Sequence, residues 1–344
     1  MQRHTVGGVD GLRAIAALGV LVYHASVFDP HIRYPATLAW MMLGGRGVDL
    51  FFVISGFCLS IAFLQRRANG NQAPFDVRRY AWARVRRIIP PYFATLLLFG
   101  LLALTPFGLP LINHAWHDAI PEFLAYFLFI FHDLRPPLDG SIWTLGIESR
   151  WYVLFPMLLA LYLRSRWLFA ALGIALYLCY YLTAILVDIG TLPCFMLGIV
   201  AADITVRKHA GSPWILFFTI LSLVAACTQQ FRDSGIDYTA PLWHLTSFFI
   251  VLTGVGTRVA RKILDLQPLR FLGIASYSIY LVHMPLLAFA ERHGAPQELT
   301  IVLSILAGLL FWRCIEAPSM AYFARTRAFG PDRGHETRSA EHDV

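Results

Sequence analysis

The chain has 344 residues, of which 57% are hydrophobic, 14% aromatic and only 14% charged. A soluble domain carries about 25% charged residues, so this composition excludes an ordinary soluble protein. The net charge of +7 comes from 28 basic and 21 acidic residues. These charges lie between apolar runs rather than in one patch, which indicates membrane topology and argues against a nucleic-acid-binding protein.

Apolar segments long enough to form transmembrane helices recur along the whole chain. A span needs roughly 20 mostly apolar residues, and we predict an all-α integral membrane bundle of about ten. In chain order, the predicted spans are 11–28, 47–64, 88–105, 146–163, 167–186, 191–206, 213–228, 239–256, 273–290 and 299–315.

An eleventh apolar stretch, 121–133, is shorter and bracketed by prolines. If the N-terminus is cytoplasmic and this stretch does not cross, 22 of the 28 basic residues lie in cytoplasmic segments, as the positive-inside rule requires. A crossing would move every later basic loop outside. We therefore predict a re-entrant or interfacial segment at 121–133 and cytoplasmic termini. Residues 1–318 form one membrane domain, and 319–344 form a polar, disordered cytoplasmic tail.

The first predicted span carries two ionisable residues, Arg13 and His24. Such residues are costly inside a membrane and mark functional sites by default. Eleven residues of helix return to nearly the same face after a rise of roughly 16 Å. Arg13 is then placed at the cytoplasmic mouth and His24 about three turns further out. A snorkelling arginine and a satisfied core histidine are the structural alternative.

Two carboxylates lie at the starts of other predicted spans. Asp49 is at the outer end of the second span, where it either stabilises the helix N-terminus or partners a buried histidine. Glu148 lies deeper in the fourth span, where capping explains it less well. The step Ser55-Gly56-Phe57 suits close helix packing better than nucleophilic catalysis.

The remaining candidates lie on a basic loop and on the ninth span. Arg84 and Arg87 are three residues apart and share a helix face. Guanidinium groups bind phosphate in a bidentate manner, although such a cluster also suits anionic lipid or topology alone. Ser276, Tyr280 and His283 share one stripe of the ninth span, which adds a second intramembrane histidine.

Together and in this order, these segments resemble the membrane-bound acyltransferase family 3 over about residues 7–318. Two positions depart from the family pattern: Thr144 stands where serine is usual, and Trp151 where phenylalanine is usual. The five blocks that carry the resemblance are Gly11-Leu12-Arg13 followed by His24; Gly47-Val48-Asp49-Leu50-Phe51-Phe52-Val53-Ile54-Ser55-Gly56-Phe57; Arg84-x-x-Arg87-Ile88-x-Pro90; Trp143-Thr144-Leu145-x-x-Glu148-x-x-Trp151-Tyr152; and Ser276-Tyr277-Ser278-Ile279-Tyr280-Leu281-x-His283.

This resemblance implies an O-acyltransferase of the bacterial cytoplasmic (inner) membrane. It implies transfer of an acyl group, commonly acetyl, from cytoplasmic acyl-CoA to a sugar hydroxyl of lipopolysaccharide, exopolysaccharide, peptidoglycan or another glycan. The expected partners are therefore acetyl-CoA or another acyl-CoA, a carbohydrate acceptor and membrane lipid. No metal is expected, because none of the five cysteines is spaced as a zinc or haem motif.

The expected roles follow the same resemblance. Arg13, Arg84 and Arg87 would meet the phosphates of the donor. His24 would act as general base, or would form a covalent acyl-histidine. Asp49 or Glu148 would hold its imidazole, and Tyr280 or Tyr277 would donate to the oxyanion. His283 completes the catalytic set.

The main rival is a proton-coupled transporter or flippase of a glycan precursor, since ten spans with buried ionisable residues also suit transport. The two halves of the chain show no repeat, which argues against it. A scaffold without chemistry leaves these buried ionisable residues without a purpose.

Overall fold

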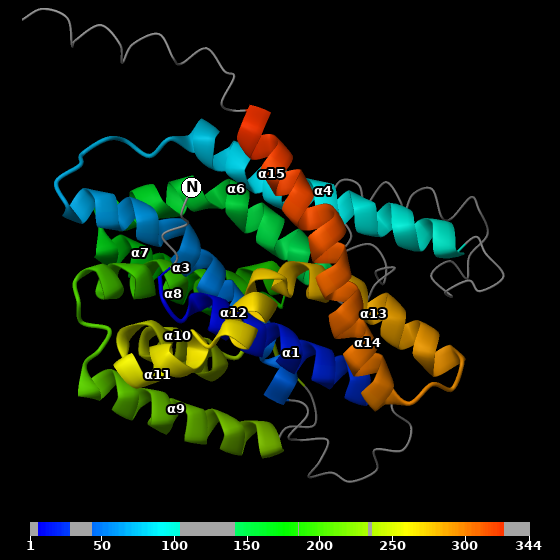
Figure 1. Ribbon diagram of the computed structural model, residues 1–344. Coiled ribbons are helices and arrows are strands. Elements are labelled where there is room, and N and C mark those ends of the chain that lie inside the picture. Colours follow the sequence, from blue (N-terminus) through cyan, green and yellow to red (C-terminus); the bar gives the residue numbers. More distant parts are fainter. Residues whose placement is uncertain (1–5, 28–42, 104–141, 185, 233–235, 327–344) are drawn as a thin grey trace, which may run out of the picture.

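The computed structural model describes residues 6–27, 43–103, 142–184, 186–232 and 236–326 (Figure 1). Over these residues every regular element is a helix, which confirms the predicted all-α class. Apolar segments become helices in a membrane because a helix satisfies its own backbone hydrogen bonds. The predicted segment 121–133 and residues 327–344 of the predicted tail lie outside the described residues.

Some consecutive helices are joined by very short connections. Only Ser165 separates α6 from α7. In chain order they are α1 (Val9–Val27), α3 (Gly47–Ala68), α4 (Val77–Ala103), α6 (Trp143–Arg164), α7 (Arg166–Thr183), α8 (Val187–Val206), α9 (Pro213–Arg232), α10 (Pro241–Gly256), α11 (Arg258–Leu264), α12 (Gln267–Ile274), α13 (Ser276–Arg292), α14 (Gln297–Phe311), a π-helical turn (Trp312–Glu316) and α15 (Ala317–Thr326).

The predicted count of about ten spans is not confirmed. In the part of the chain that the structure describes, six helices are long and apolar enough to cross a membrane, or eight if each bent pair is one span. The bent pairs are α10 with α11, at 91°, and α12 with α13, at 70°. The helices α4 and α6 are not in this set.

Two predicted boundaries also change. Helix α4 begins at Val77, eleven residues before the predicted span at 88, so Arg84 and Arg87 lie within the helix rather than before it. At the other end, α15 runs to Thr326 and covers the first eight residues of the predicted tail.

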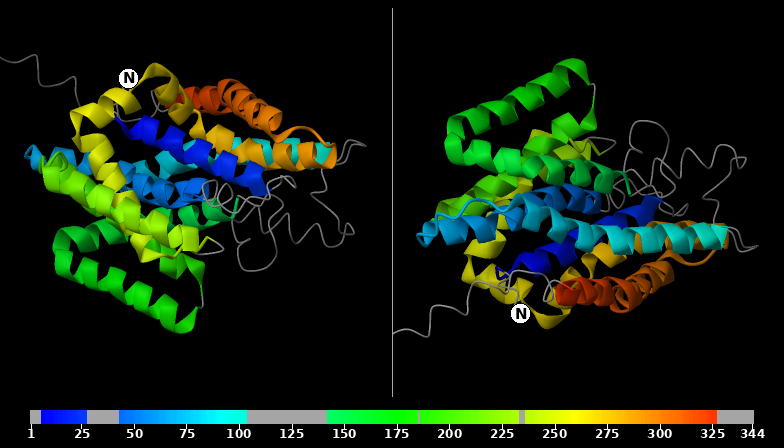
Figure 2. Two further views of the ribbon diagram at one scale, coloured as in Figure 1. Left: turned by 90° about the horizontal axis from the view of Figure 1, so that it is seen from below. Right: turned by 90° about the horizontal axis from the view of Figure 1, so that it is seen from above.

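Helix α3 forms the centre of the bundle and α7 lies at its edge (Figure 2). In the span Leu43–Ala68, 78% of the most apolar stretch is buried, compared with 6% in α7. Gly56 and Gly198 allow α3 and α8 to meet backbone to backbone: a Cβ on Gly198 would lie 2.2 Å from the carbonyl oxygen of Val53. This confirms the close packing predicted at Gly56.

Candidate functional site

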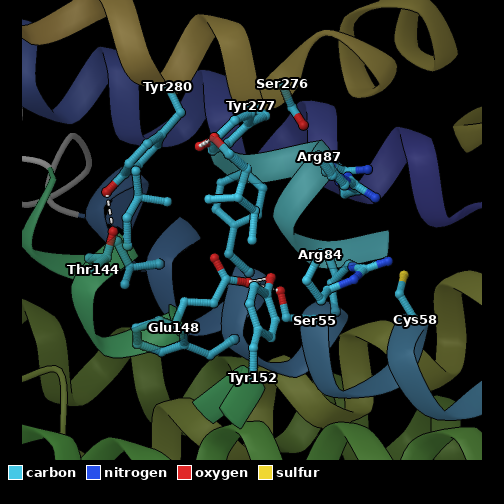
Figure 3. Close-up of a pocket in the computed structure, with 17 residues that line it drawn as sticks. Ser55, Cys58, Arg84, Arg87, Thr144, Glu148, Tyr152, Ser276, Tyr277 and Tyr280 are labelled. Atoms are coloured by element: carbon cyan, nitrogen blue, oxygen red, sulfur yellow. Dashed lines mark hydrogen bonds between the residues drawn. The ribbon is translucent and has the colours of Figure 1, made fainter. Parts of the chain in front are cut away.

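A cavity lies among α1, α3, α4, α6 and α13 (Figure 3). Five of the eight predicted site residues line it, from four of these helices: Arg13, Arg84, Arg87, Glu148 and Tyr280. These residues are up to 267 positions apart in sequence. The fold therefore gathers most of the predicted set around one space.

One end of the cavity is basic. Figure 3 shows Arg84 and Arg87 side by side with Cys58, and Arg13 also lines the cavity. The Arg84 guanidinium lies 5.8 Å from the ring centroid of Tyr152. Its Nε is buried and has no hydrogen-bond partner among the described residues. A buried donor without a partner is costly, so this end is suited to a ligand that supplies acceptor oxygens.

The middle of the cavity holds Glu148, the single acid among the described residues that line it. The hydroxyls of Ser55 and Tyr152 both donate to Glu148 Oε1. Tyr152 is in turn fixed by Tyr80, whose hydroxyl donates to the Tyr152 carbonyl at 2.9 Å. Glu148 is therefore bonded to neutral hydroxyls, and the cavity keeps a positive balance from its three arginines.

The opposite end is closed by two hydroxyls. Thr144 Oγ1 and the Tyr280 hydroxyl are 2.6 Å apart (Figure 3). The Tyr280 ring packs edge-on against Phe51, with centroids 6.1 Å apart. On its other side it approaches the His283 ring, at 5.4 Å. Tyr280 thus connects the cavity to the histidines.

His24 and His283 form a hydrogen-bonded pair, although neither is among the cavity-lining residues. His24 Nδ1 lies 2.9 Å from His283 Nε2, and His283 Nδ1 lies 2.7 Å from the carbonyl oxygen of Tyr280. A carbonyl only accepts, so His283 carries its proton on Nδ1. Its Nε2 then accepts from His24 Nδ1, which leaves a lone pair on His24 Nε2. His283 is buried, whereas His24 is half-buried.

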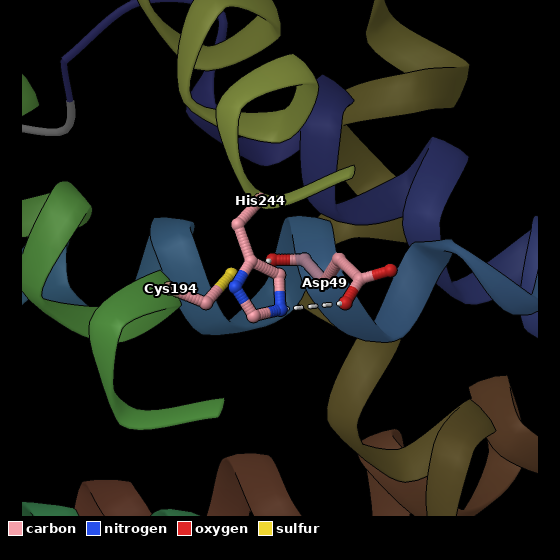
Figure 4. Close-up of side chains that lie close together, drawn as sticks. All are labelled: Asp49, Cys194 and His244. Carbon is pink, nitrogen blue, oxygen red and sulfur yellow. Dashed lines mark hydrogen bonds and ion pairs between the residues drawn. The ribbon is translucent and has the colours of Figure 1, made fainter. Parts of the chain in front are cut away.

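We expected a carboxylate beside His24, and the structure places a second imidazole there. Glu148 is bonded to Ser55 and Tyr152. Asp49 belongs to another cluster: its carboxylate lies 3.5 Å from Arg46 and 3.4 Å from His244 Nε2 (Figure 4). Neither carboxylate is therefore the group that orients His24.

The cluster around Asp49 is buried, and neither carboxylate oxygen of Asp49 has a hydrogen-bond partner among the described residues. His244 Nε2 donates to the carbonyl of Tyr238 at 2.9 Å and faces Asp49, while His244 Nδ1 accepts from the Tyr177 hydroxyl. Asp49, Cys194 and His244 offer ligand atoms within 4.8 Å of one another. A metal would have to displace one of the two hydrogen bonds of His244 and would lie near the Arg46 guanidinium. The arrangement fits a structural ion-pair network better.

Sequence reasoning missed several of these partners. The sequence pattern presented Tyr152 and Thr144 only as parts of a family motif and Ser55 as part of a packing step, and His244 was not singled out at all. His244 is a histidine inside the predicted span 239–256. The rule that ionisable residues inside a span mark functional sites, which identified His24 and His283, therefore applies to it equally. No local pattern signals Arg46, because it precedes its helix.

Comparison with known proteins gives a consistent result. A family model described as an acyltransferase domain matches residues 6–315. YrhL of Bacillus subtilis is 27% identical over 89% of this chain and 53% of its own length. The peptidoglycan O-acetyltransferase OatA of Listeria monocytogenes is 25% identical, over 83% and 50%. The O-acetyltransferase OatA of Staphylococcus aureus is 25% identical, over 95% and 59%.

The chain thus spans 50–59% of the length of these curated relatives. No solved structure matches it.

Proposed function

This chain belongs to the acyltransferase family whose model it matches, and we propose that it transfers an acetyl group from acetyl-CoA to a glycan hydroxyl. The proposed acceptor is a sugar of the cell envelope, with peptidoglycan first because the Listeria relative is named for it. The proposed location is the cytoplasmic membrane, with both termini in the cytoplasm. The positive-inside distribution of the basic residues supports this orientation.

One observation carries the proposal: a single cavity joins an unmatched arginine cluster to the Tyr280 end, beside the histidine pair. The phosphates of the donor are assigned to Arg13, Arg84 and Arg87, because guanidinium groups bind phosphate in a bidentate manner. The pantetheine arm runs along the cavity past Glu148. The thioester then comes to the end at Tyr280. Along α1, Arg13 and His24 are separated by a rise of roughly 16 Å, which suits such an extended donor.

His24 acts as the general base in the proposed reaction. Its Nε2 takes the proton of the sugar hydroxyl as the hydroxyl oxygen attacks the thioester carbonyl. The tetrahedral intermediate expels CoA as a thiolate, which recovers the proton from the His24 imidazolium. The Tyr280 hydroxyl donates a hydrogen bond to the oxyanion.

His283 replaces the carboxylate of a hydrolase triad in this scheme. It holds His24 in the tautomer whose Nε2 is free. Its neutral Nε2 also accepts from Nδ1 of the imidazolium that forms during the reaction. The hydrogen-bond chain ends on the Tyr280 carbonyl, which cannot take a proton, so only one proton moves.

A transfer assay tests the proposal. Purified protein is incubated with radiolabelled acetyl-CoA and peptidoglycan fragments, and labelled glycan is measured by mass and radioactivity. We expect transfer by the wild type and a loss of at least a hundredfold in His24→Ala. Membrane insertion and thermal unfolding of the variant serve as controls. Transfer at near-normal rates in a folded His24→Ala protein contradicts the proposed base, and donor binding without turnover in the wild type favours a transporter.

A further inference from the structure

A second basic pocket lies apart from the proposed active site, at the ends of α3, α6, α7 and α8. We call it the basic pocket. Its charged lining residues lie at the ends of these four helices: Arg67, Arg164, Arg166, Arg207 and Asp203. These helix ends are the ones that the sequence predicts to be cytoplasmic.

Asp203 is the only acid among the described residues that line the basic pocket, and it is already engaged. Asp203 Oδ2 lies 2.9 Å from Arg207 Nε and 3.2 Å from Arg166, and it accepts from the Tyr162 hydroxyl at 2.8 Å. The guanidinium groups of Arg67 and Arg164 make no hydrogen bond or ion pair with any residue the structure describes. Four arginines against one aspartate leave three positive charges, so the pocket is complementary to an anion.

An apolar groove continues from this pocket along the outer helices. The two spaces share Tyr162, Arg166 and Trp167. The groove runs between α7, α8 and α10, and its lining is almost entirely apolar: Phe169, Ala170, Gly173, Ile174, Met196, Leu197, Val200 and Leu245. Trp167 is 87% exposed where the two spaces meet. Tryptophan favours this level, at the membrane–water interface.

We propose that the basic pocket and the groove together bind one anionic phospholipid. The phosphate lies between Arg67 and Arg164, and one acyl chain lies in the groove along α7. A basic pocket beside membrane helices binds anionic headgroups in this way. The groove excludes a free phosphate compound as the preferred ligand, because only a lipid fills both spaces. Because the basic pocket carries a net positive charge, a zwitterionic lipid is expected to bind more weakly than an anionic one.

Lipid titration of the purified chain in detergent, followed by native mass spectrometry, tests the site. The probes are dioleoyl phosphatidylglycerol and dioleoyl phosphatidylcholine, which share the same chains. We expect one retained phosphatidylglycerol, with at least tenfold weaker binding in Arg67→Gln/Arg164→Gln. The matched control is Arg258→Gln/Arg270→Gln, which removes two exposed arginines from α11 and α12 and is expected to change binding less than twofold. Equal losses in both pairs, or equal binding of the two lipids, overturn the proposal.

A second variant tests the groove alone. A Cβ on Gly173 would meet only Met196, at 3.6 Å, so Gly173→Phe fills the groove without touching the arginines. Ile174→Trp does the same from a position that is 61% exposed. Both variants are expected to weaken the binding of dioleoyl phosphatidylglycerol several-fold. The binding of the water-soluble dihexanoyl analogue is expected to stay unchanged. Undiminished binding of the long-chain lipid in both variants, with unfolding midpoints at the wild-type value, contradicts the groove assignment.

Discussion

At the scale of single residues, two hydrogen bonds determine what His24 is able to do. The carbonyl of Tyr280 holds the proton of His283 on Nδ1, and His283 Nε2 holds the proton of His24 on Nδ1. The lone pair of His24 Nε2 is free as a consequence. A neutral imidazole supplies less electrostatic stabilisation of an imidazolium than a carboxylate does, so the main contribution of His283 is orientation and tautomer.

His283→Ala tests this positioning role. We expect kcat for acetyl transfer to fall by about a hundredfold, because His24 loses its tautomer and ring orientation. KM for acetyl-CoA changes little, since His283 lies apart from the arginine end of the cavity. His283→Gln retains an oxygen able to accept from His24 Nδ1 and is expected to recover part of the activity. Steady-state kinetics of the wild type and the two variants check these expectations. A rise in KM with unchanged kcat in His283→Ala contradicts the positioning role of His283.

At the scale of helices, the site depends on the contact between α3 and α8. These two helices approach so closely that a Cβ on Gly56 would lie 2.1 Å from the carbonyl oxygen of Phe195. The same contact brings Cys194 Sγ to 3.3 Å from the carbonyl of Asp49. Helix α3 also presents Ser55 to Glu148. Its depth in the bundle therefore sets the register of one wall of the cavity.

Gly198→Ala measures the strength of this contact. The added Cβ would lie 2.2 Å from the carbonyl oxygen of Val53 and 2.7 Å from Phe57 N, both of them backbone atoms. We expect a loss of about 1–3 kcal/mol in stability from overpacking. Gly173→Ala is the matched control, because its Cβ meets only the end of Met196, and alanine favours the helix. Thermal unfolding in detergent compares them; equal midpoints for the two variants contradict the tight contact.

At the scale of the whole molecule, the bundle brings five helices around one elongated cavity. Its arginine end and its Tyr280 end have different chemistry, and Glu148 lies between them. Cys58 belongs to the arginine end, which makes its thiol a reporter for that part of the cavity. Donor binding is assigned to the arginine end and the reaction to the Tyr280 end. We therefore expect that a variant can impair donor binding without impairing the reaction, and the reverse.

The double variant Arg84→Gln/Arg87→Gln is expected to raise KM for acetyl-CoA at least tenfold while leaving KM for the glycan nearly unchanged, because phosphate contacts are lost. Arg78→Gln/Arg79→Gln is the matched control on the same helix, where both arginines are exposed and outside the cavity. Acetyl-CoA is also expected to protect Cys58 from maleimide, but not the exposed Cys314. The donor assignment is contradicted if acetyl-CoA does not protect Cys58 from maleimide in the wild type. It is also contradicted if both double variants lose this protection to the same extent.

The sequence alone determined the class of the molecule and the identity of most residues around the cavity. Its long apolar runs specify helices because, in a membrane, a helix satisfies all its backbone hydrogen bonds within one segment. Its uncommon intramembrane ionisable residues were recognisable because each is costly there. The count of spans was less predictable, since basic residues in α4 and the bends before α11 and α13 obscure where a helix crosses.

Only the tertiary structure decided which of these residues are partners. His24 and His283 are 259 positions apart, and Asp49 and His244 are 195 apart. Such pairs form through the packing of α1 on α13 and of α3 on α10. The sequence made Asp49 as reasonable a partner for His24 as for any other histidine. Side-chain hydrogen bonds reach only about 3 Å, so the packing geometry, which no local pattern encodes, makes the choice.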